Sequence, residues 1–183
     1  MTTIETERLL LEPWHERWLE EYVQVAADPE VMRYIGAGVP WNRKESERSF
    51  ARSLEHWQRH GFGKRSLVEK ATGAWLGFVE LAHVGPEAIE VSPGEVEIGW
   101  WLTRSAWGRG FATEGAIALR DEGFERVGLD RVIGRFQPEN AASGRIMEKL
   151  GMRFERDAIG RHGGPIRIYA LSRAGWLERP RIA

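Results

Sequence analysis

Between a predicted strand and a predicted helix, the chain reads Trp107-Gly108-Arg109-Gly110-Phe111-Ala112-Thr113-Glu114. The small residues at positions 108, 110 and 112 allow backbone N–H groups to approach a ligand closely. The helix that follows adds the positive end of its dipole at the same place. This arrangement predicts a cradle for an anion such as a phosphate group.

Two common phosphate-binding loops do not fit this segment. A P-loop would continue with Gly-Lys-Ser or Gly-Lys-Thr, and neither follows Gly110. A dinucleotide fingerprint needs a different glycine spacing and an acidic residue at the end of the next strand. The chain also lacks a Gly-x-Ser-x-Gly elbow, so a serine hydrolase would have no nucleophile.

The predicted elements around this segment indicate an α/β fold. Before it, the patterns predict strands over 8–12, 63–69, 75–83 and 95–103 and helices over 14–25 and 44–60. After it, they predict helices over 113–127 and 139–150 and strands over 131–136, 152–157 and 166–172. Since a strand, a crossover helix and a second strand form a parallel pair, we expect a mixed sheet, antiparallel early and parallel in its middle.

Composition restricts the class of protein. The chain has 183 residues, and a chain of that length can bury roughly 70% of its unfolded surface, so we expect one domain over residues 1–183. The 26 Lys and Arg residues nearly balance the 27 Asp and Glu residues, which disfavours nucleic acid as a partner. Because the chain has no cysteine, disulfides, thiolate metal sites and cysteine nucleophiles are excluded.

The N-terminal sequence shows no targeting signal. Its longest apolar run covers residues 9–11, far less than the apolar core of a signal peptide or a membrane span. We therefore expect a cytoplasmic protein without a membrane partner, either a monomer or a homodimer.

Charge is distributed unevenly along the chain. Between Glu80 and Thr103 there are five acidic residues and no Lys or Arg: Glu80, Glu87, Glu90, Glu95 and Glu97. From Arg104 to the end, fifteen basic residues face ten acidic ones. The asymmetry indicates either solvated surfaces or a cleft with one wall for a cation and one for an anion.

Several further motifs, in a fixed order, make the chain resemble a GNAT-family N-acetyltransferase, with the RimJ/RimL-like branch as the nearest match. The motifs are Thr6-Glu7-Arg8-Leu9-Leu10-Leu11, Asp28-Pro29-Glu30-Val31-Met32-Arg33-Tyr34-Ile35, Val96-Glu97-Ile98-Gly99-Trp100-Trp101-Leu102, Pro138-Glu139-Asn140-Ala141-Ala142-Ser143, Glu148-Lys149-Leu150-Gly151-Met152 and Tyr169-Ala170-Leu171-Ser172-Arg173. The resemblance implies a mixed sheet whose central parallel strands splay apart, flanked by helices.

The resemblance also implies acetyl-CoA as co-substrate and no metal. Its pyrophosphate would lie on the backbone amides of residues 108–113, that is Gly108, Arg109, Gly110, Phe111, Ala112 and Thr113. Its pantetheine arm would follow the strand that ends at Leu102 and Thr103, and Asn140 would meet the pantetheine amides. Trp107 stands where the family usually has Arg or Gln, which leaves one pyrophosphate contact to Arg109 or to backbone alone.

In this family the acetyl group passes directly from the thioester to an amine. The reaction needs a neutral amine, a donor for the developing oxyanion and a proton for the departing thiolate. Glu97 is the candidate base, directly or through a water, and Glu80 on the neighbouring strand is the alternative. Glu97, like Glu95 on the same strand face, also fits an ordinary polar position on a half-exposed strand. A backbone N–H near Trp101 or Leu102 is the expected oxyanion donor.

The proton for the thiolate has no obvious source in this sequence. Many family members carry a tyrosine seven residues after the asparagine, and this chain has Met147 there. Ser143, one helical turn after Asn140, is the nearest hydroxyl on a compatible face. It is predicted to hydrogen-bond the sulfur, although a plain helix-capping role fits equally well. Bulk water and Tyr169 are the alternatives.

Histidines and tryptophans suggest other sites. His56 and His60 have the i, i+4 spacing of metal ligands, but Trp57 stands where a zinc protease needs Glu, and no third ligand is evident, so we expect surface histidines. Of the nine tryptophans, Trp14, Trp18 and Trp75 are predicted to be core. The remaining candidates for an acceptor pocket are Trp41, Trp57, Trp100 and Trp101.

The predicted function is an enzyme that acetylates a primary amine, either a protein N-terminal α-amine or a small-molecule amine. Two rivals stay open. The same fold can serve as an acyl-CoA-binding or sensing module without turnover, or it can transfer a longer acyl group such as succinyl.

Overall fold

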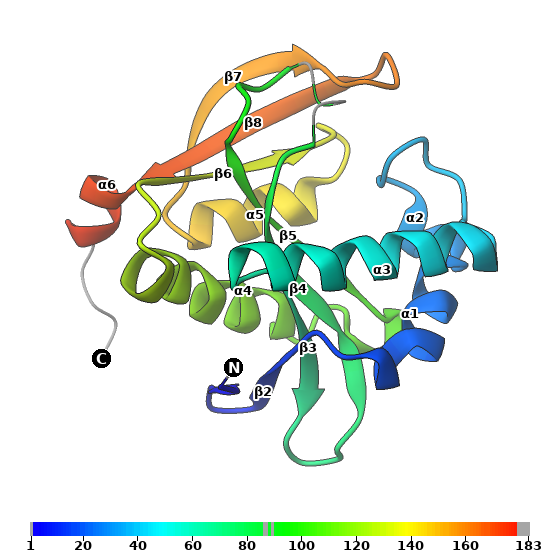
Figure 1. Cartoon of the computed structure of the whole chain (residues 1–183). Coiled ribbons are helices and arrows are strands. Elements are labelled where there is room, and N and C mark those ends of the chain that lie inside the picture. The colour runs from blue at the N-terminus through cyan, green and yellow to red at the C-terminus, as the bar shows by residue number, and fades with distance from the viewer. Residues whose placement is uncertain (1, 86–87, 89, 179–183) are drawn as a thin grey trace.

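The computed structural model describes residues 2–85, 88 and 90–178. Its strands form one sheet in the order β1-β2-β3-β4-β5-β6-β8-β7. Their bounds are β1 (Ile4–Glu5), β2 (Leu9–Pro13), β3 (Lys64–Glu69), β4 (Trp75–His83), β5 (Val96–Leu102), β6 (Arg131–Phe136), β7 (Arg153–Ile159) and β8 (Pro165–Ser172). In Figure 1 the sheet extends from β2 at the bottom to β7 and β8 at the top.

Strands β5 and β6 are the parallel pair, and the other neighbouring strands in the described sheet pair antiparallel. The register between β5 and β6 is one pair, Glu97 opposite Ile133. Because this pair lies near the start of β5, the C-terminal ends of the two strands separate, while β4 stays paired with β5 from Gly77 to His83. The expected α/β fold with a splayed central pair is confirmed.

Helices cover both faces of this sheet. Their bounds are α1 (Leu19–Ala26), α2 (Pro29–Met32), α3 (Arg43–His60), α4 (Phe111–Glu122), α5 (Ala141–Lys149) and α6 (Arg173–Leu177). Successive side chains of a strand point to opposite faces of the sheet. Ile98 and Leu102 of β5 pack with Phe111 of α4, whereas Trp101 packs with Tyr22 of α1 and Phe50 of α3 in a second core cluster.

Local sequence signals explain where helices begin and end. The Asn42 side chain accepts a hydrogen bond from Glu45 N–H, and the Glu45 carboxylate accepts one from Asn42 N–H, which is a capping box at the start of α3. Gly61 ends this helix with φ +72°. The predicted helix over 44–60 is therefore confirmed to within one residue.

Other boundaries differ from the predictions. The short helix α2 was not predicted; Asp28 caps it, with Pro29 at its first position. The first helix was predicted from residue 14 and begins at Leu19, after a short 3₁₀ turn over Glu16–Trp18. The helix predicted over 113–127 begins at Phe111 and finishes as a π-helical turn, Gly123–Val127.

A buried ion pair joins the sheet to α4. The guanidinium of Arg65, 1% exposed, donates from Nε to Glu122 Oε2 at 2.7 Å, and Nη2 makes a second bond to the same carboxylate. Arg65 Nη1 also donates to the backbone oxygens of Thr2 and Leu11. The pair therefore holds β2, β3 and α4 in fixed register.

We expect Glu122→Gln to destabilise the fold by about 3 kcal/mol, because it leaves the buried Arg65 charge without a counter-ion. The measurement is chemical denaturation with the slope compared between variants. Glu47→Gln is the matched control, since Glu47 pairs with Arg43 on the exposed face of α3 and such pairs contribute little. Equal midpoints for the two variants would show that the Arg65 pair does not stabilise the fold.

Within the described residues, every helix is too short or too polar to cross a bilayer.

Candidate active site

The glycine-rich loop leads into α4 at the open end of the β5–β6 pair. Gly108 and Gly110 adopt φ values of +71° and +82°, in the left-handed region that favours glycine. A Cβ on Gly108 would meet nothing within 4 Å, and one on Gly110 would meet only Arg8 Nη2, at 3.4 Å. Space for a ligand therefore lies directly against this backbone.

The start of α4 has no side-chain cap, in contrast to the starts of α3 and α5, which are capped by Asn42 and Asn140. The N–H groups of a first helical turn have no partner inside the helix and need an acceptor from elsewhere. An anion seated on the loop would supply that acceptor and would interact favourably with the helix dipole.

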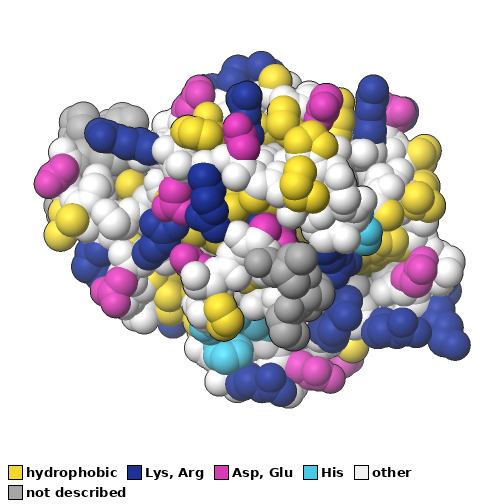
Figure 2. All heavy atoms as spheres, turned by 90° about the horizontal axis from the view of Figure 1, so that it is seen from above, with side chains coloured by type: hydrophobic (Ala, Val, Ile, Leu, Met, Phe, Trp, Pro, Cys, Tyr) yellow, Lys and Arg dark blue, Asp and Glu magenta, His cyan; other side chains and the backbone are white. Residues whose placement is uncertain are grey.

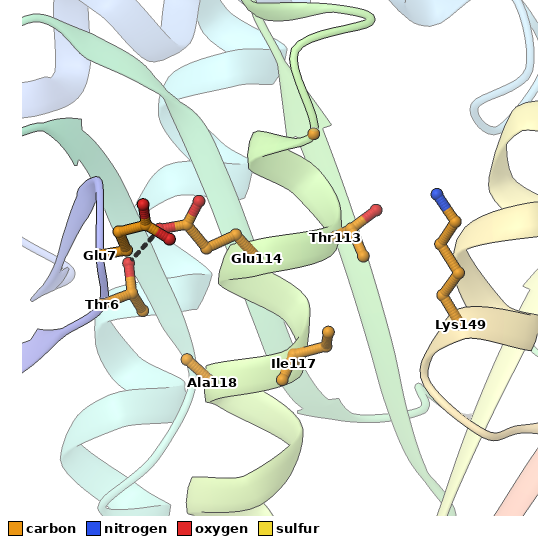
Figure 3. Close-up of a pocket in the computed structure, with 8 residues that line it drawn as sticks. Thr6, Glu7, Thr113, Glu114, Ile117, Ala118 and Lys149 are labelled. Carbon is orange, nitrogen blue, oxygen red and sulfur yellow. Dashed lines mark hydrogen bonds between the residues drawn. The ribbon is translucent and has the colours of Figure 1, made fainter. Parts of the chain in front are cut away.

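A cavity of about 450 Å³ opens beside this helix start. It is lined by Thr6, Glu7, Gly110, Thr113, Glu114, Ile117, Ala118 and Lys149. Figure 3 shows the Lys149 amine of α5 reaching toward the Thr113 hydroxyl of α4. Sequence reasoning missed Lys149 because its place in the cavity depends on how α5 lies beside α4.

Glu114 fixes the turn between β1 and β2 against α4. Its Oε1 accepts from the Thr6 hydroxyl at 2.6 Å and from Arg8 N–H at 2.8 Å, and its Oε2 accepts from Arg8 Nε at 2.7 Å. Burial acts to raise the pKa of Glu114, but these hydrogen bonds and the Arg8 charge hold it below its ordinary value. The carboxylate is a structural anchor at the cavity wall.

The side chain of Arg109 is engaged away from the loop. Its Nη2 pairs with Glu69 Oε1 at 2.6 Å, and its guanidinium lies 4.6 Å from the centre of the Phe111 ring. The Glu69 pair uses only Nη2, so an anion could still be contacted by the other guanidinium N–H groups or the backbone N–H of Arg109. Trp107, 47% exposed, donates from Nε1 to Leu102 O at 3.0 Å, so it ties the loop to the end of β5.

The other predicted ligand-binding residues lie on the two sides of the opening. Leu102 ends β5 with a buried side chain, and the half-buried Thr103 donates its N–H to Leu76 O at 2.9 Å. On the β6 side, Asn140 Oδ1 accepts from Ser143 N–H at 3.2 Å and so caps α5.

Glu97 and Glu80 lie on the same face of the sheet. Glu80 is opposite Gly99 in the β4–β5 register, and a Cβ on Gly99 would lie 3.5 Å from Glu80 Oε1. Arg135 of β6 binds both oxygens of Glu97, at 3.1 Å from Nε and 2.6 Å from Nη2, and it also bonds Glu90. Burial, together with the Glu80 charge, raises the pKa of Glu97 above its ordinary value, although Arg135 acts to lower it.

Lys64 is a buried cation that sequence reasoning missed. Its Nζ lies 3.4 Å from Glu80 Oε2 and 4.4 Å from the centre of the Phe78 ring, with Tyr22 and Trp101 also around it. Burial acts to lower the pKa of Lys64, but Glu80 and Tyr22 hold it above its ordinary value. Lys64 therefore balances the charge of Glu80.

The acidic segment is largely neutralised by arginines of β6. Arg131 pairs with Glu95 at 3.2 Å, and Arg135 pairs with Glu90 and Glu97. Glu87 lies outside the described residues. The uneven charge distribution thus reflects ion pairs across the β5–β6 boundary, and the hypothesis of separate anionic and cationic cleft walls is wrong for these residues.

The tryptophan predictions are partly confirmed. Trp14 and Trp75 are core, and Trp18 packs against the same cluster. Trp57 was expected in an acceptor pocket but is 4% exposed and donates from Nε1 to Lys64 O at 2.5 Å. It is a core residue because it faces the sheet from α3.

Of the other three tryptophans, Trp41 and Trp101 are half-buried and contact each other, with ring centres 5.3 Å apart. Trp100 belongs to the opposite face of β5, against the α4 cluster.

The prediction that His56 and His60 have no third partner is wrong. His83, at the end of β4, lies with its ring centre 5.5 Å from that of His56 and 4.4 Å from that of His60. No local pattern joins His83 to the helix, since 27 residues separate it from His56.

The opened parallel pair and the uncapped helix start are features expected of a transferase that uses a CoA thioester. Residues 8–153 match the family described as Acetyltransferase (GNAT) domain. The chain therefore belongs to the GNAT acetyltransferase family, and it is an N-acetyltransferase.

Two relatives support this assignment. A protein of Bacillus licheniformis named uncharacterized N-acetyltransferase p20 is 30% identical, and the match covers 94% of this chain and 96% of that protein. The FsC-acetyl coenzyme A-N(2)-transacetylase of Aspergillus fumigatus is 29% identical over 96% of this chain and 78% of its own.

Solved structures share the fold. An acetyltransferase from Agrobacterium tumefaciens has a TM-score of 0.79 with 29% identity, covering 93% of this chain and 94% of that one. RimL, a ribosomal L7/L12 alpha-N-protein acetyltransferase in complex with CoA, has a TM-score of 0.75, 15% identity and coverage of 93% and 98%. At that identity the likeness to RimL shows the fold alone.

Proposed function

We propose that this protein transfers the acetyl group of acetyl-CoA directly to a primary amine, as a single-domain enzyme of the RimJ/RimL-like branch. The observation that carries the proposal is the uncapped, glycine-lined start of α4 at the end of the splayed β5–β6 pair. Acetyl-CoA as donor is supported by the family match and by the name of the Aspergillus relative.

The residues of the opening fit the parts of acetyl-CoA. The backbone amides of residues 108–113 would hold the pyrophosphate, since Gly108 and Gly110 leave room against the backbone. Leu102 and Thr103 would flank the pantetheine arm on one side and Asn140 on the other. We add Lys149, whose ammonium group lies at the cavity rim and would balance a phosphate charge.

Glu97 is the proposed group that removes the proton from the acceptor amine, directly or through a water. A carboxylate with a raised pKa is a better base once ionised. Arg135 orients both of its oxygens, so one of those hydrogen bonds has to be released or shared during proton transfer.

Glu80 is the second candidate for the base. Its carboxylate has a longer ion pair, 3.4 Å to Lys64, and lies on the same face as Glu97. A comparison of Glu80→Gln with Glu97→Gln at several pH values separates the two.

The acceptor amine is proposed to have a low pKa. At pH 7 an α-amine of pKa about 7.7 to 8 is roughly 10 to 20% neutral, whereas a lysine amine near 10.4 is under about 0.1% neutral. An N-terminal α-amine or an activated small-molecule amine therefore depends less on the base to remove its proton. Turnover with a panel of such amines, monitored through the release of the free thiol of CoA, tests the function. Competition between different acyl-CoAs tests the preference for acetyl over a longer chain.

Ser143→Ala should lower kcat by about tenfold or more with little change in affinity for acetyl-CoA, the scale expected for one lost hydrogen bond in the transition state. The reason is the place of Ser143 in the first turn of α5, beside the opening. Single-turnover acetylation measures the chemical step. Ser92→Ala, an exposed serine in the loop before β5, is the control. An unaltered chemical rate in Ser143→Ala would leave water or Tyr169 as the proton source.

A further inference from the structure

Three histidines from two elements come together beside the C-terminal end of β4. His56 and His60 lie in the last two turns of α3, and His83 ends β4. One ring nitrogen from each lies within 4.8 Å of the others. Figure 2 shows a patch of histidine side chains on the surface of the molecule, and a cation arriving from solvent could reach such a patch.

The spacing of these nitrogens approaches that of a metal site. Nitrogens bound at 2.0–2.1 Å to a tetrahedral zinc ion lie about 3.3 Å from one another. His56 Nε2 and His83 Nδ1 are 3.3 Å apart, where they form a hydrogen bond that a bound cation would replace. His60 is exposed, so a small rotation of its side chain can bring its nitrogen into place without disturbing the core.

The surroundings of His56 select the nitrogen that would bind. Its Nδ1 lies 2.9 Å from Phe62 O, and because a carbonyl only accepts, Nδ1 carries the proton and Nε2 keeps its lone pair. Metal-binding histidines are commonly held in this way by a backbone carbonyl. At present Nε2 accepts the His83 backbone N–H at 3.2 Å, a bond that a cation would replace.

We propose that His56, His60 and His83 form a binding site for a divalent transition-metal ion of the zinc type. Three imidazole ligands leave the fourth tetrahedral position to water. The ion would join the C-terminal end of α3 to the end of β4. It takes no part in acetyl transfer as proposed above.

Isothermal titration of the whole protein with ZnCl₂ tests this site, with visible absorption of bound Co²⁺ reporting the ligand geometry. Because the chain has no cysteine, thiolates cannot contribute to either signal. We expect one Zn²⁺ per chain, and a loss of affinity of at least about tenfold in His60→Ala and in His83→Ala, since each removes one ligand. The thermal midpoint should rise with Zn²⁺ and not with Mg²⁺.

His162→Ala is the matched control, because His162 is exposed and lies outside the cluster. It should bind Zn²⁺ as the parent does. His60 is exposed, so its variant is expected to fold, and the acetyl-CoA affinity of each variant verifies that it does. Absence of Zn²⁺ binding in the parent, or equal affinity in parent, His60→Ala and His83→Ala, would overturn the proposal and leave a stack of imidazole rings.

Discussion

Gly110→Asp should abolish measurable binding of acetyl-CoA, a loss of at least about 100-fold, while the fold persists. Gly110 is the N-cap residue of α4 and, as a glycine, offers no side chain to cap the helix in the parent. A carboxylate at that position would itself accept from the first-turn N–H groups. It would also repel the pyrophosphate and fill the space that glycine leaves open.

Calorimetry with CoA measures this effect. Gly128→Asp is the control, because Gly128 has the same φ of +82°, nothing within 4 Å of a Cβ, and a place at the end of the π-helical turn. Gly128→Asp therefore imposes the same backbone strain at a position outside the proposed pyrophosphate-binding loop. If both variants bind CoA equally well, the pyrophosphate does not lie on the α4 start.

Glu97→Gln is expected to lower kcat/KM by about 10² to 10⁴ at pH 7 for an amine that is mostly protonated, the usual range for a general base. Because the pKa of Glu97 is raised by burial, the parent's kcat/KM should fall as pH drops through that raised value. The variant should not show this fall of kcat/KM at low pH. The difference in kcat/KM between variant and parent should shrink as pH rises, because more of the amine is then neutral.

Glu95→Gln serves as the control for this variant. Glu95, two residues before Glu97, pairs with Arg131 of β6, so the exchange removes a comparable ion pair. It should leave the pH profile in place. If Glu97→Gln lowers kcat/KM by the same factor at pH 7 and at pH 9, Glu97 positions substrate or supports the strand. If Glu80→Gln, and not Glu97→Gln, removes the fall of kcat/KM at low pH, the base is Glu80.

Much of the fold follows from local sequence patterns. The predicted strands 75–83 and 131–136 coincide with β4 and β6, and the box at Asn42 with Gly61 delimits α3. These elements have strong periodicity or clear end signals. The short β1, α2 and α6 were not predicted, because elements of two to five residues carry no measurable period.

The site was predictable only where it lies on one continuous segment. The loop from Gly108 to Thr113 could be read as an anion cradle because its glycines and its helix are adjacent in the chain. The ion-pair partners of the charged residues in the site could not be predicted. Arg135 bonds Glu97, which is 38 residues away in the chain, and Arg109 bonds Glu69, which is 40 residues away. Such pairs depend on strand order and register, which only the folded sheet defines.

Acetylation of an amine with acetyl-CoA can be measured by turnover of isotope-labelled acetyl-CoA with a panel of peptides that have free N-termini and of small amines. Free thiol and labelled amide are quantified together by mass spectrometry. We expect equal amounts of both products with at least one amine, and none of either with Gly110→Asp. Tight CoA binding by calorimetry with no labelled amide across the panel would rule out acetyl transfer and identify a CoA-binding module instead.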